Sequence, residues 1–246
     1  MKTPAYVDPV RLQSSVLAGA EKRLLVSMAE RLPRWIGPDH LTALALAAMV
    51  LAGGSYWLAS RHPIGLVLAT LFLAVNWFGD SLDGTVARVR QAQRPRYGFY
   101  VDHVVDAIGT TCLIGGLALS GYMTPAVALV LLVAYSLVTV EIYLATVVNG
   151  TFRMAFLAVG PTELRILLAV GNTWVVFDPT VTLLGQTWLL FDVAGAVGAA
   201  GLAAAFLVAA ARNTRALYLA EPLPRPAVPT GGTPPSSGPT DPFPPR

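Results

Sequence analysis

Residues 64–88 read IGLVLATLFLAVNWFGDSLDGTVAR, an apolar stretch that ends in two aspartates and an arginine. A helix of about 20 apolar residues crosses the hydrocarbon core of a bilayer. The uncharged part, residues 64–79, is shorter than that, but the helical pattern continues past Gly79 toward Gln91. We therefore expect a helix that spans a membrane and carries its carboxylates at one membrane boundary.

The composition of the whole chain is that of a membrane protein. Of its 246 residues 54% are hydrophobic and only 13% charged, and the mean hydropathy is +0.59. Soluble globular proteins carry about 25% charged residues. The single cysteine, Cys112, excludes an intrachain disulfide and a cysteine-rich metal site. The fold class we expect is all-α, a polytopic membrane helix bundle.

Six segments have the length and apolar character of transmembrane helices. The fifth is the least regular, because Gly171 and Asn172 interrupt it. The six predicted spans are residues 41–59, 64–79, 99–120, 124–147, 162–177 and 187–211.

The basic residues predict the orientation of these spans. With both termini in the cytosol, 16 of the 17 Lys and Arg residues lie on the cytosolic side, and only Arg61 lies outside. Cytosolic loops of membrane proteins are enriched in Lys and Arg. This asymmetry explains the net charge of +3 without a nucleic-acid partner. We expect an N-in/C-in protein of the bacterial plasma membrane.

Two terminal regions flank the predicted membrane domain of residues 38–218. In residues 1–37, apolar and charged positions alternate at helical spacing between Arg11 and Arg34, which predicts an amphipathic helix. This helix either lies on the membrane surface or packs against the bundle. Residues 219–246 contain ten of the 19 prolines, and we expect them to be disordered.

Four of the 14 acidic residues fall in two short windows beside the second and third spans. At about 100° per residue, each window places two aspartates and small residues in one stripe along a helix. Small residues allow a helix or a flat ligand to approach the backbone closely. The two stripes consist of Asp80, Asp83, Gly84 and Ala87, and of Gly98, Asp102, Asp106 and Gly109.

Carboxylates near a membrane interior repel one another and are costly to bury. Hard divalent cations bound by oxygen ligands offset this cost, and Mg²⁺ or Mn²⁺ suits carboxylates that also hold phosphates. Two such ions balance four negative charges, an arrangement that recurs in phosphoryl chemistry. Arg88, one turn beyond the first stripe, can pair with a phosphate.

These residues carry a family resemblance. The pattern Asp80-x2-Asp83-Gly84-x2-Ala87-Arg88-x9-Gly98-x3-Asp102-x3-Asp106 resembles the signature of the CDP-alcohol phosphotransferases at all eight positions. With its six-span architecture the resemblance covers roughly residues 35–212. The family often has Pro-Asn before its first span, whereas this chain has Pro38-Asp39.

The resemblance implies transfer of a phosphatidyl or other substituted phosphoryl group from a CDP-alcohol, foremost CDP-diacylglycerol, to an acceptor hydroxyl, with release of CMP. It implies two Mg²⁺ or Mn²⁺ ions on the four aspartates, with Asp106 also acting as general base. The cytidine nucleotide would lie at Gly84, Ala87 and Gly98, beside Asp80 and Asp83, with Arg88 on the diphosphate. The resemblance also implies a homodimer.

The motif does not identify the acceptor. Glu141, near the depth of Asp106, would suit a cationic acceptor or pair with a neighbouring side chain. Glu163 and Arg165 follow Pro161 at a predicted helix start, where Arg165 would hold an acceptor phosphate or anchor the helix at the interface.

Three other functions fit parts of the sequence. Transfer of a CDP-linked choline or ethanolamine head group to diacylglycerol uses the same signature. Membrane carboxylates also mark cation- or proton-coupled transporters, but those sites lie near the bilayer midplane, deeper than these aspartates. A non-catalytic relative used for assembly is disfavoured, because none of the eight positions is lost. We therefore expect an enzyme of phospholipid synthesis.

Overall fold

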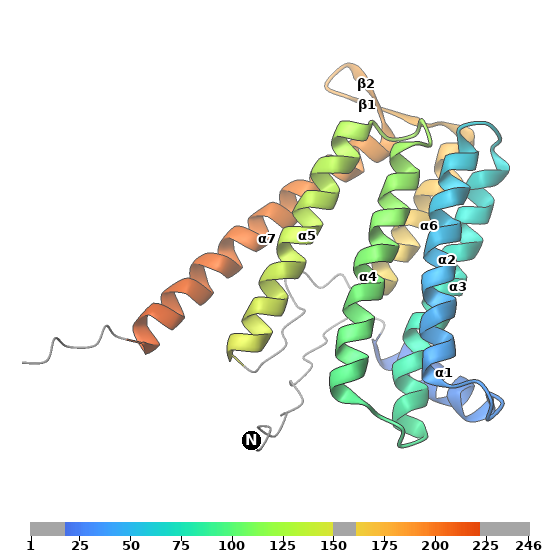
Figure 1. Ribbon diagram of the computed structural model, residues 1–246. Coiled ribbons are helices and arrows are strands. Elements are labelled where there is room, and N and C mark those ends of the chain that lie inside the picture. Colours follow the sequence, from blue (N-terminus) through green and yellow to red (C-terminus); the bar gives the residue numbers. More distant parts are fainter. Residues whose placement is uncertain (1–17, 150–160, 222–246) are drawn as a thin grey trace, which may run out of the picture.

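The computed structural model describes residues 18–149 and 161–221, which form seven helices and one β-hairpin. Helices α2 to α7 run up and down one bundle, and α1 lies across one end of it (Figure 1). The hairpin lies at the opposite end. The elements are α1 (Ala18–Arg31), α2 (Pro38–Ala59), α3 (Ile64–Val89), α4 (Pro95–Ala118), α5 (Pro125–Asn149), α6 (Pro161–Phe177), β1 (Thr180–Leu183), β2 (Gln186–Leu189) and α7 (Leu190–Ala220).

The predicted helical membrane architecture is confirmed in its main features. Five helices, α2, α3, α4, α5 and α7, are long and apolar enough to span a membrane. Helix α6, the fifth predicted span, has 17 residues and is not among these five. The six-span count and the N-in/C-in orientation stay predictions.

Both ends of the last predicted span were wrong. The last helix does not begin at Thr187, because residues 187–189 belong to strand β2, and it continues past Ala211 to Ala220. Residues 219 and 220, which were predicted to be disordered, thus belong to α7. Residues 222–246 of the predicted disordered region lie outside the described residues. The helical pattern past Gly79 is confirmed, since α3 continues to Val89.

The hairpin between α6 and α7 was not predicted. Its antiparallel register pairs Thr180 with Leu189 and Leu183 with Gln186. Both turn residues, Leu184 and Gly185, have positive φ, at 51° and 78°. This is the backbone of a two-residue hairpin turn, in which glycine is favoured at the second position.

Prolines mark the starts of four helices. Pro38, Pro95, Pro125 and Pro161 are the first residues of α2, α4, α5 and α6. Proline suits this position because its fixed φ is helical and its missing N–H has no partner in the first turn.

Helix α2 is the centre of the bundle, because it packs against both α3 and α4. At its crossing with α4, a Cβ on Gly53 would lie 2.2 Å from the Cys112 carbonyl oxygen, and one on Gly116 would lie 2.0 Å from the Gly53 carbonyl oxygen. On the α3 side, a Cβ on Gly79 would lie 2.7 Å from the Leu41 carbonyl oxygen. These glycines bring the backbones of the site helices together.

Helix α1 packs on the end of the bundle that carries the acidic windows. Its buried residues Leu25 and Ala29 join a cluster with Leu41 of α2 and Leu82 of α3. The guanidinium of Arg90, just past α3, donates to four carbonyls between Leu32 and Ile36, including Ile36 at 2.6 Å and Leu32 at 2.9 Å. Residues 11–17 of the predicted N-terminal helix lie outside the described residues, and its described part, α1, packs against the bundle.

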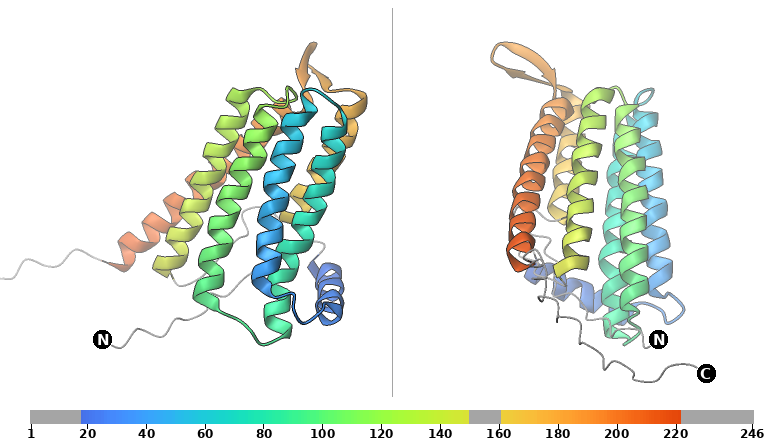
Figure 2. Two further views of the ribbon diagram at one scale, coloured as in Figure 1. Left: turned by 45° about the vertical axis from the view of Figure 1, so that its right-hand side comes forward. Right: turned by 60° about the vertical axis from the view of Figure 1, so that its left-hand side comes forward.

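Helices α5 and α7 lie side by side and lean away from α2, α3 and α4 (Figures 1 and 2). Glu141 of α5, which is 8% exposed, accepts a hydrogen bond from Asn213 of α7 at 2.5 Å. Large apolar side chains on both helices remain exposed, such as Leu129, Leu144 and Leu207. Such faces suit contact with lipid.

Candidate active site

The four aspartates lie at one end of the bundle. Asp80 and Asp83 are near the C-terminal end of α3, and Asp102 and Asp106 are in the first half of α4, all half-buried. Electrostatic interactions connect Asp106 with the other three, and Asp83 with both Asp80 and Asp102. The structure therefore brings together the two acidic stripes that the sequence predicted.

Asp83 is held from two sides. The Thr42 hydroxyl, one turn into α2, donates to Asp83 Oδ2 at 2.6 Å, and the Gly84 backbone N–H donates to Oδ1. Thr42 was not among the predicted site residues. Its only sequence signal is its place just after Pro38-Asp39, where the family pattern is recognisable.

Asp80 is paired with a helix that is distant in sequence. One terminal nitrogen of Arg165 on α6 lies 2.6 Å from Asp80 Oδ2, and its Nε donates to Asn76 Oδ1 at 2.8 Å. The Arg165 side chain is only 16% exposed. Arg165 therefore lies in the site and is more than an anchor at the membrane interface.

Asn76 extends this arrangement to α2. It is buried, and its side-chain nitrogen donates to the Ala45 carbonyl at 3.1 Å. Helices α2, α3 and α6 are thus joined through Asn76, Arg165 and Asp80. Asn76 was not predicted, and an asparagine inside an apolar helix is the signal that could have found it.

The two aspartates of α4 have different surroundings. Asp102 Oδ2 lies 4.0 Å from Nδ1 of His103. The centroid of the His103 ring lies 4.1 Å from that of Phe99, which is tilted to it, and 4.4 Å from that of Tyr143, which meets it edge-on. His103 is 9% exposed and thus packs between α4 and α5. Within the described residues Asp106 forms no hydrogen bond or ion pair, so its carboxylate is available to a ligand.

Of the predicted nucleotide positions, Gly98 faces open space, whereas Gly84 lies against Arg88. A Cβ on Gly98 would meet nothing within 4 Å, and one on Gly84 would meet the Arg88 guanidinium at 3.4 Å. Arg88 is exposed and donates to the Thr85 hydroxyl at 3.1 Å, while Ala87 is half-buried. A flat ligand can therefore approach this side of α3 and α4.

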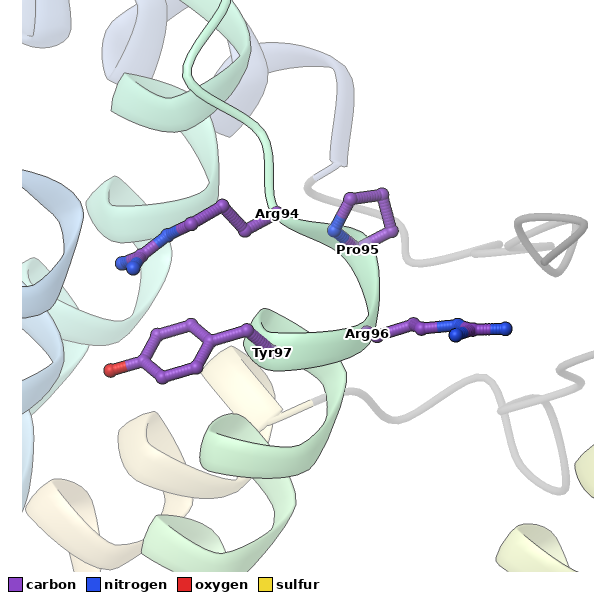
Figure 3. A pocket seen from close by; sticks show the side chains of 4 residues that line it. All are labelled: Arg94, Pro95, Arg96 and Tyr97. Carbon is purple, nitrogen blue, oxygen red and sulfur yellow. The ribbon is translucent and has the colours of Figure 1, made fainter. Parts of the chain in front are cut away.

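A pocket of about 400 Å³ adjoins Gly98 at the start of α4, lined by Arg94, Pro95, Arg96 and Tyr97. The side chains of Arg94 and Tyr97 extend in one direction and that of Arg96 in the opposite one (Figure 3).

The guanidinium of Arg94 lies 2.5 Å from the Asp39 carboxylate and 4.1 Å from the centroid of the Tyr97 ring. The hydrogen bond to Asp39 raises the pKa of the Arg94 guanidinium above its ordinary value. Asp39, which stands where the family often has asparagine, is thus neutralised by Arg94.

The donor set fits a hard divalent cation, because four carboxylates supply oxygen ligands and no described residue forms a hydrogen bond with Asp106. No three His, Cys, Asp or Glu side chains of the described residues converge closely enough to hold a metal ion. Asp80 and Asp83 accept hydrogen bonds from Arg165 and Thr42.

The three predicted acceptor residues are placed differently. Arg165 contacts the carboxylate site, whereas the observed partner of Glu141 is Asn213 on α7. Glu163 lies in the first turn of α6, two residues before Arg165. A role for Glu141 or Glu163 in acceptor binding stays a prediction.

Comparison with known proteins identifies the class. The profile of the CDP-alcohol phosphatidyltransferase family matches residues 35–207, and the chain belongs to this family. This range contains all four aspartates, Arg88 and Arg165.

Two individual proteins resemble the chain. Archaetidylinositol phosphate synthase of Pyrococcus horikoshii is 30% identical over 86 residues, which are 35% of this chain and 43% of that protein's length. The match thus spans less than half of that relative. The crystal structure of Mycobacterium tuberculosis phosphatidylinositol phosphate synthase with CDP-DAG bound has the same fold, with a TM-score of 0.54 and 20% identity. That similarity covers 80% of this chain and 94% of the other.

Proposed function

We propose that this protein is a membrane transferase that moves a phosphatidyl group from CDP-diacylglycerol to an acceptor hydroxyl and releases CMP. The observation that carries this proposal is the placement of Asp80 and Asp83 of α3 and of Asp102 and Asp106 of α4 at one end of the bundle, where their charges act on one another, in a chain of the CDP-alcohol phosphatidyltransferase family. The solved relative that shares the fold has CDP-DAG bound, which supports the same donor here.

Asp80, Asp83, Asp102 and Asp106 would hold Mg²⁺ or Mn²⁺, two ions in the full site. When bound, the ions would neutralise the diphosphate and the charge that develops on departing CMP. The open space beside Gly98 accommodates the cytidine nucleotide, and the exposed Arg88 pairs with its diphosphate.

Asp106 is the residue that would accept the proton of the acceptor hydroxyl. Its carboxylate is half-buried and close to the other three, and no described side chain occupies it through a hydrogen bond. A base must reach the proton it removes, and a carboxylate that forms no hydrogen bond with the described residues meets that condition.

For the acceptor we propose a phosphorylated polyol of the inositol phosphate kind. The names of both relatives specify inositol phosphate lipids. Arg165 supplies a cation at the edge of the carboxylate site, and a guanidinium pairs well with a phosphate. A cationic acceptor is less well supported, because the observed partner of Glu141 is Asn213.

The proposed setting is a bacterial plasma membrane with the site on the cytosolic side and six spans that include α6. Support comes from the alternating course of α2 to α7 (Figure 1) and from the placement of 16 of the 17 basic residues. The homodimer implied by the family resemblance belongs to the same proposal.

The test is CMP release from CDP-diacylglycerol by purified protein in lipid nanodiscs. Acceptors to compare are inositol phosphate, inositol, glycerol 3-phosphate, serine and none, each with Mg²⁺, with Mn²⁺ and with a chelator. Diacylglycerol with CDP-choline tests the head-group alternative. We expect release only with a divalent ion and fastest with inositol phosphate.

Asp106→Asn is expected to lower CMP release by about a thousandfold, since a positioned base contributes about 10² to 10⁴ in rate. Asp178→Asn is the matched control. Asp178 lies between α6 and β1, and its carboxylate accepts hydrogen bonds from Thr180. Full activity in Asp106→Asn would remove Asp106 as the base, and release without any divalent ion would remove the metal site.

A further inference from the structure

Helix α6 carries Arg165 into the site but buries little apolar surface in doing so. Its well-buried side chains are Asn172, at 1% exposed, and Val175, at 3%. Leu167, Val170 and Trp174 are each about 60% exposed. In a bilayer, apolar side chains are as stable against lipid as against protein, so burial alone does not fix the depth of such a helix.

Buried hydrogen bonds connect α6 to two other helices. The Tyr56 hydroxyl of α2 donates to Asn172 Oδ1 at 2.8 Å, and Asn172 Nδ2 donates to the Thr70 hydroxyl of α3 at 3.0 Å. Thr70 in turn donates to the Leu66 carbonyl at 2.9 Å. Tyr56 is 0% exposed. If α6 slid or rotated, these polar groups would lose their partners in a medium without water, which is unfavourable.

Asn172 and Arg165 lie on the same face of α6. They are seven residues apart, which is two helical turns and about 10 Å along the axis. Arg165 makes the second polar attachment of this face, to Asn76 and Asp80 of α3. Attachments at two heights determine both the depth and the rotation of a helix.

We infer that Asn172 is a positioning residue for acceptor binding, and that its hydrogen bonds to Tyr56 and Thr70 set the depth at which Arg165 meets the carboxylate site. This inference rests on the proposed function, in which Arg165 binds the phosphate of the acceptor. Asn172 itself lies two turns away from the reacting groups and acts through α6.

The kinetic test compares Asn172→Leu with Thr173→Val. Leucine keeps the size of asparagine and removes its polar atoms, whereas Thr173 is an exposed neighbour whose hydroxyl bonds the Ala169 carbonyl of its own helix. For Asn172→Leu we expect the KM for inositol phosphate to rise about tenfold, because the hydrogen bonds to Tyr56 and Thr70 are lost. The KM for CDP-diacylglycerol should stay unchanged, and Thr173→Val should match the wild type.

The same substitution in an Arg165→Gln background separates positioning from general destabilisation. If Asn172 acts through Arg165, Asn172→Leu should raise the acceptor KM no further once Arg165 is gone. A further loss of the same size in that background, or equal rises in both KM values, would overturn the inference. Tyr56→Phe removes one hydroxyl only and serves in place of Asn172→Leu should that variant not fold.

A distance measurement tests the inference without enzyme activity. Spin labels on Leu167 of α6 and Val67 of α3, both exposed, are introduced in a Cys112→Ser background. We expect the distance distribution to shift and broaden in Asn172→Leu and in Tyr56→Phe but not in Thr173→Val. An unchanged distance distribution in both Asn172→Leu and Tyr56→Phe would overturn the inference. If the wild type transfers nothing to any acceptor, the proposed function fails. The distance measurement still decides whether the hydrogen bonds of Asn172 to Tyr56 and Thr70 position α6.

Discussion

At the scale of single residues, each aspartate of α3 is held by a partner from another helix. Thr42 of α2 donates to Asp83, and Arg165 of α6 donates to Asp80. A carboxylate that accepts a hydrogen bond keeps its orientation, which matters when it must act as a metal ligand. Residues outside the signature thus determine where the signature carboxylates point.

Thr42→Val is expected to raise the Mg²⁺ concentration needed for half-maximal CMP release by about tenfold. The reason is the loss of a hydrogen bond to a charged group, worth about 1.5 to 3 kcal/mol, of which part is recovered by solvent. Thr42→Ser retains the hydroxyl and should behave as the wild type. The measurement is a Mg²⁺ titration of CMP release at saturating substrates.

Thr111→Val provides the matched control for Thr42→Val. Thr111 is exposed on α4, and its hydroxyl bonds the Ala107 carbonyl of its own helix. The same Mg²⁺ requirement in Thr42→Val and Thr111→Val would show that the Thr42 hydrogen bond has no role in orienting Asp83.

At the scale of elements, the crossing of α2 and α4 depends on glycines. Gly53 and Gly116 bring the two backbones so close that a Cβ on either would overlap a carbonyl oxygen of the other helix. This crossing sets the distance of α4 from α2, and therefore the position of Asp102 and Asp106 relative to α3. The adjacent Gly54 is exposed, and a Cβ there would meet nothing within 4 Å.

Gly53→Ala is expected to destabilise the protein by about 1 to 3 kcal/mol, the usual cost of an overpacked contact. Gly54→Ala should leave the stability unchanged or raise it by up to about 1 kcal/mol, because alanine favours a helix. Thermal unfolding in detergent, followed by circular dichroism, measures both variants. Equal midpoints for the two would contradict the close backbone crossing.

At the scale of the whole molecule, the number of spans decides on which side of the membrane each loop lies. With six spans, the hairpin and the turn at Arg61 lie outside and the end of α7 lies in the cytosol. If α6 did not span, the hairpin would lie in the cytosol and the end of α7 outside. Three exposed positions report on these loops: Leu184 in the hairpin, Arg61 in the α2–α3 turn and Arg215 near the end of α7.

Cysteines at these three positions, introduced singly in a Cys112→Ser background, test the topology. On intact cells a membrane-impermeant maleimide should label Leu184→Cys and Arg61→Cys, and Arg215→Cys only after permeabilisation. Labelling of Arg215→Cys but not Leu184→Cys on intact cells would show that α6 does not cross the membrane.

The hairpin shows what the sequence pattern could not predict. Its two strands have only four residues each, too few for a reliable period of two, and Trp188 and Leu189 continue without a break into the apolar stretch of α7. Hydropathy therefore extended the last span into strand β2. Helix α6 agrees with its predicted range of residues 162–177, and a full crossing of the membrane by its 17 residues stays a prediction.

The sequence alone determined the helical membrane character, five of the spans and the two acidic stripes, because hydropathy, helical period and residue spacing are local properties of the chain. The tertiary structure decided that Arg165 meets Asp80, that Thr42 holds Asp83 and that Tyr56 and Thr70 enclose Asn172. These contacts join residues 41 to 116 positions apart. They follow from the packing of α2, α3 and α6, which no local pattern specifies.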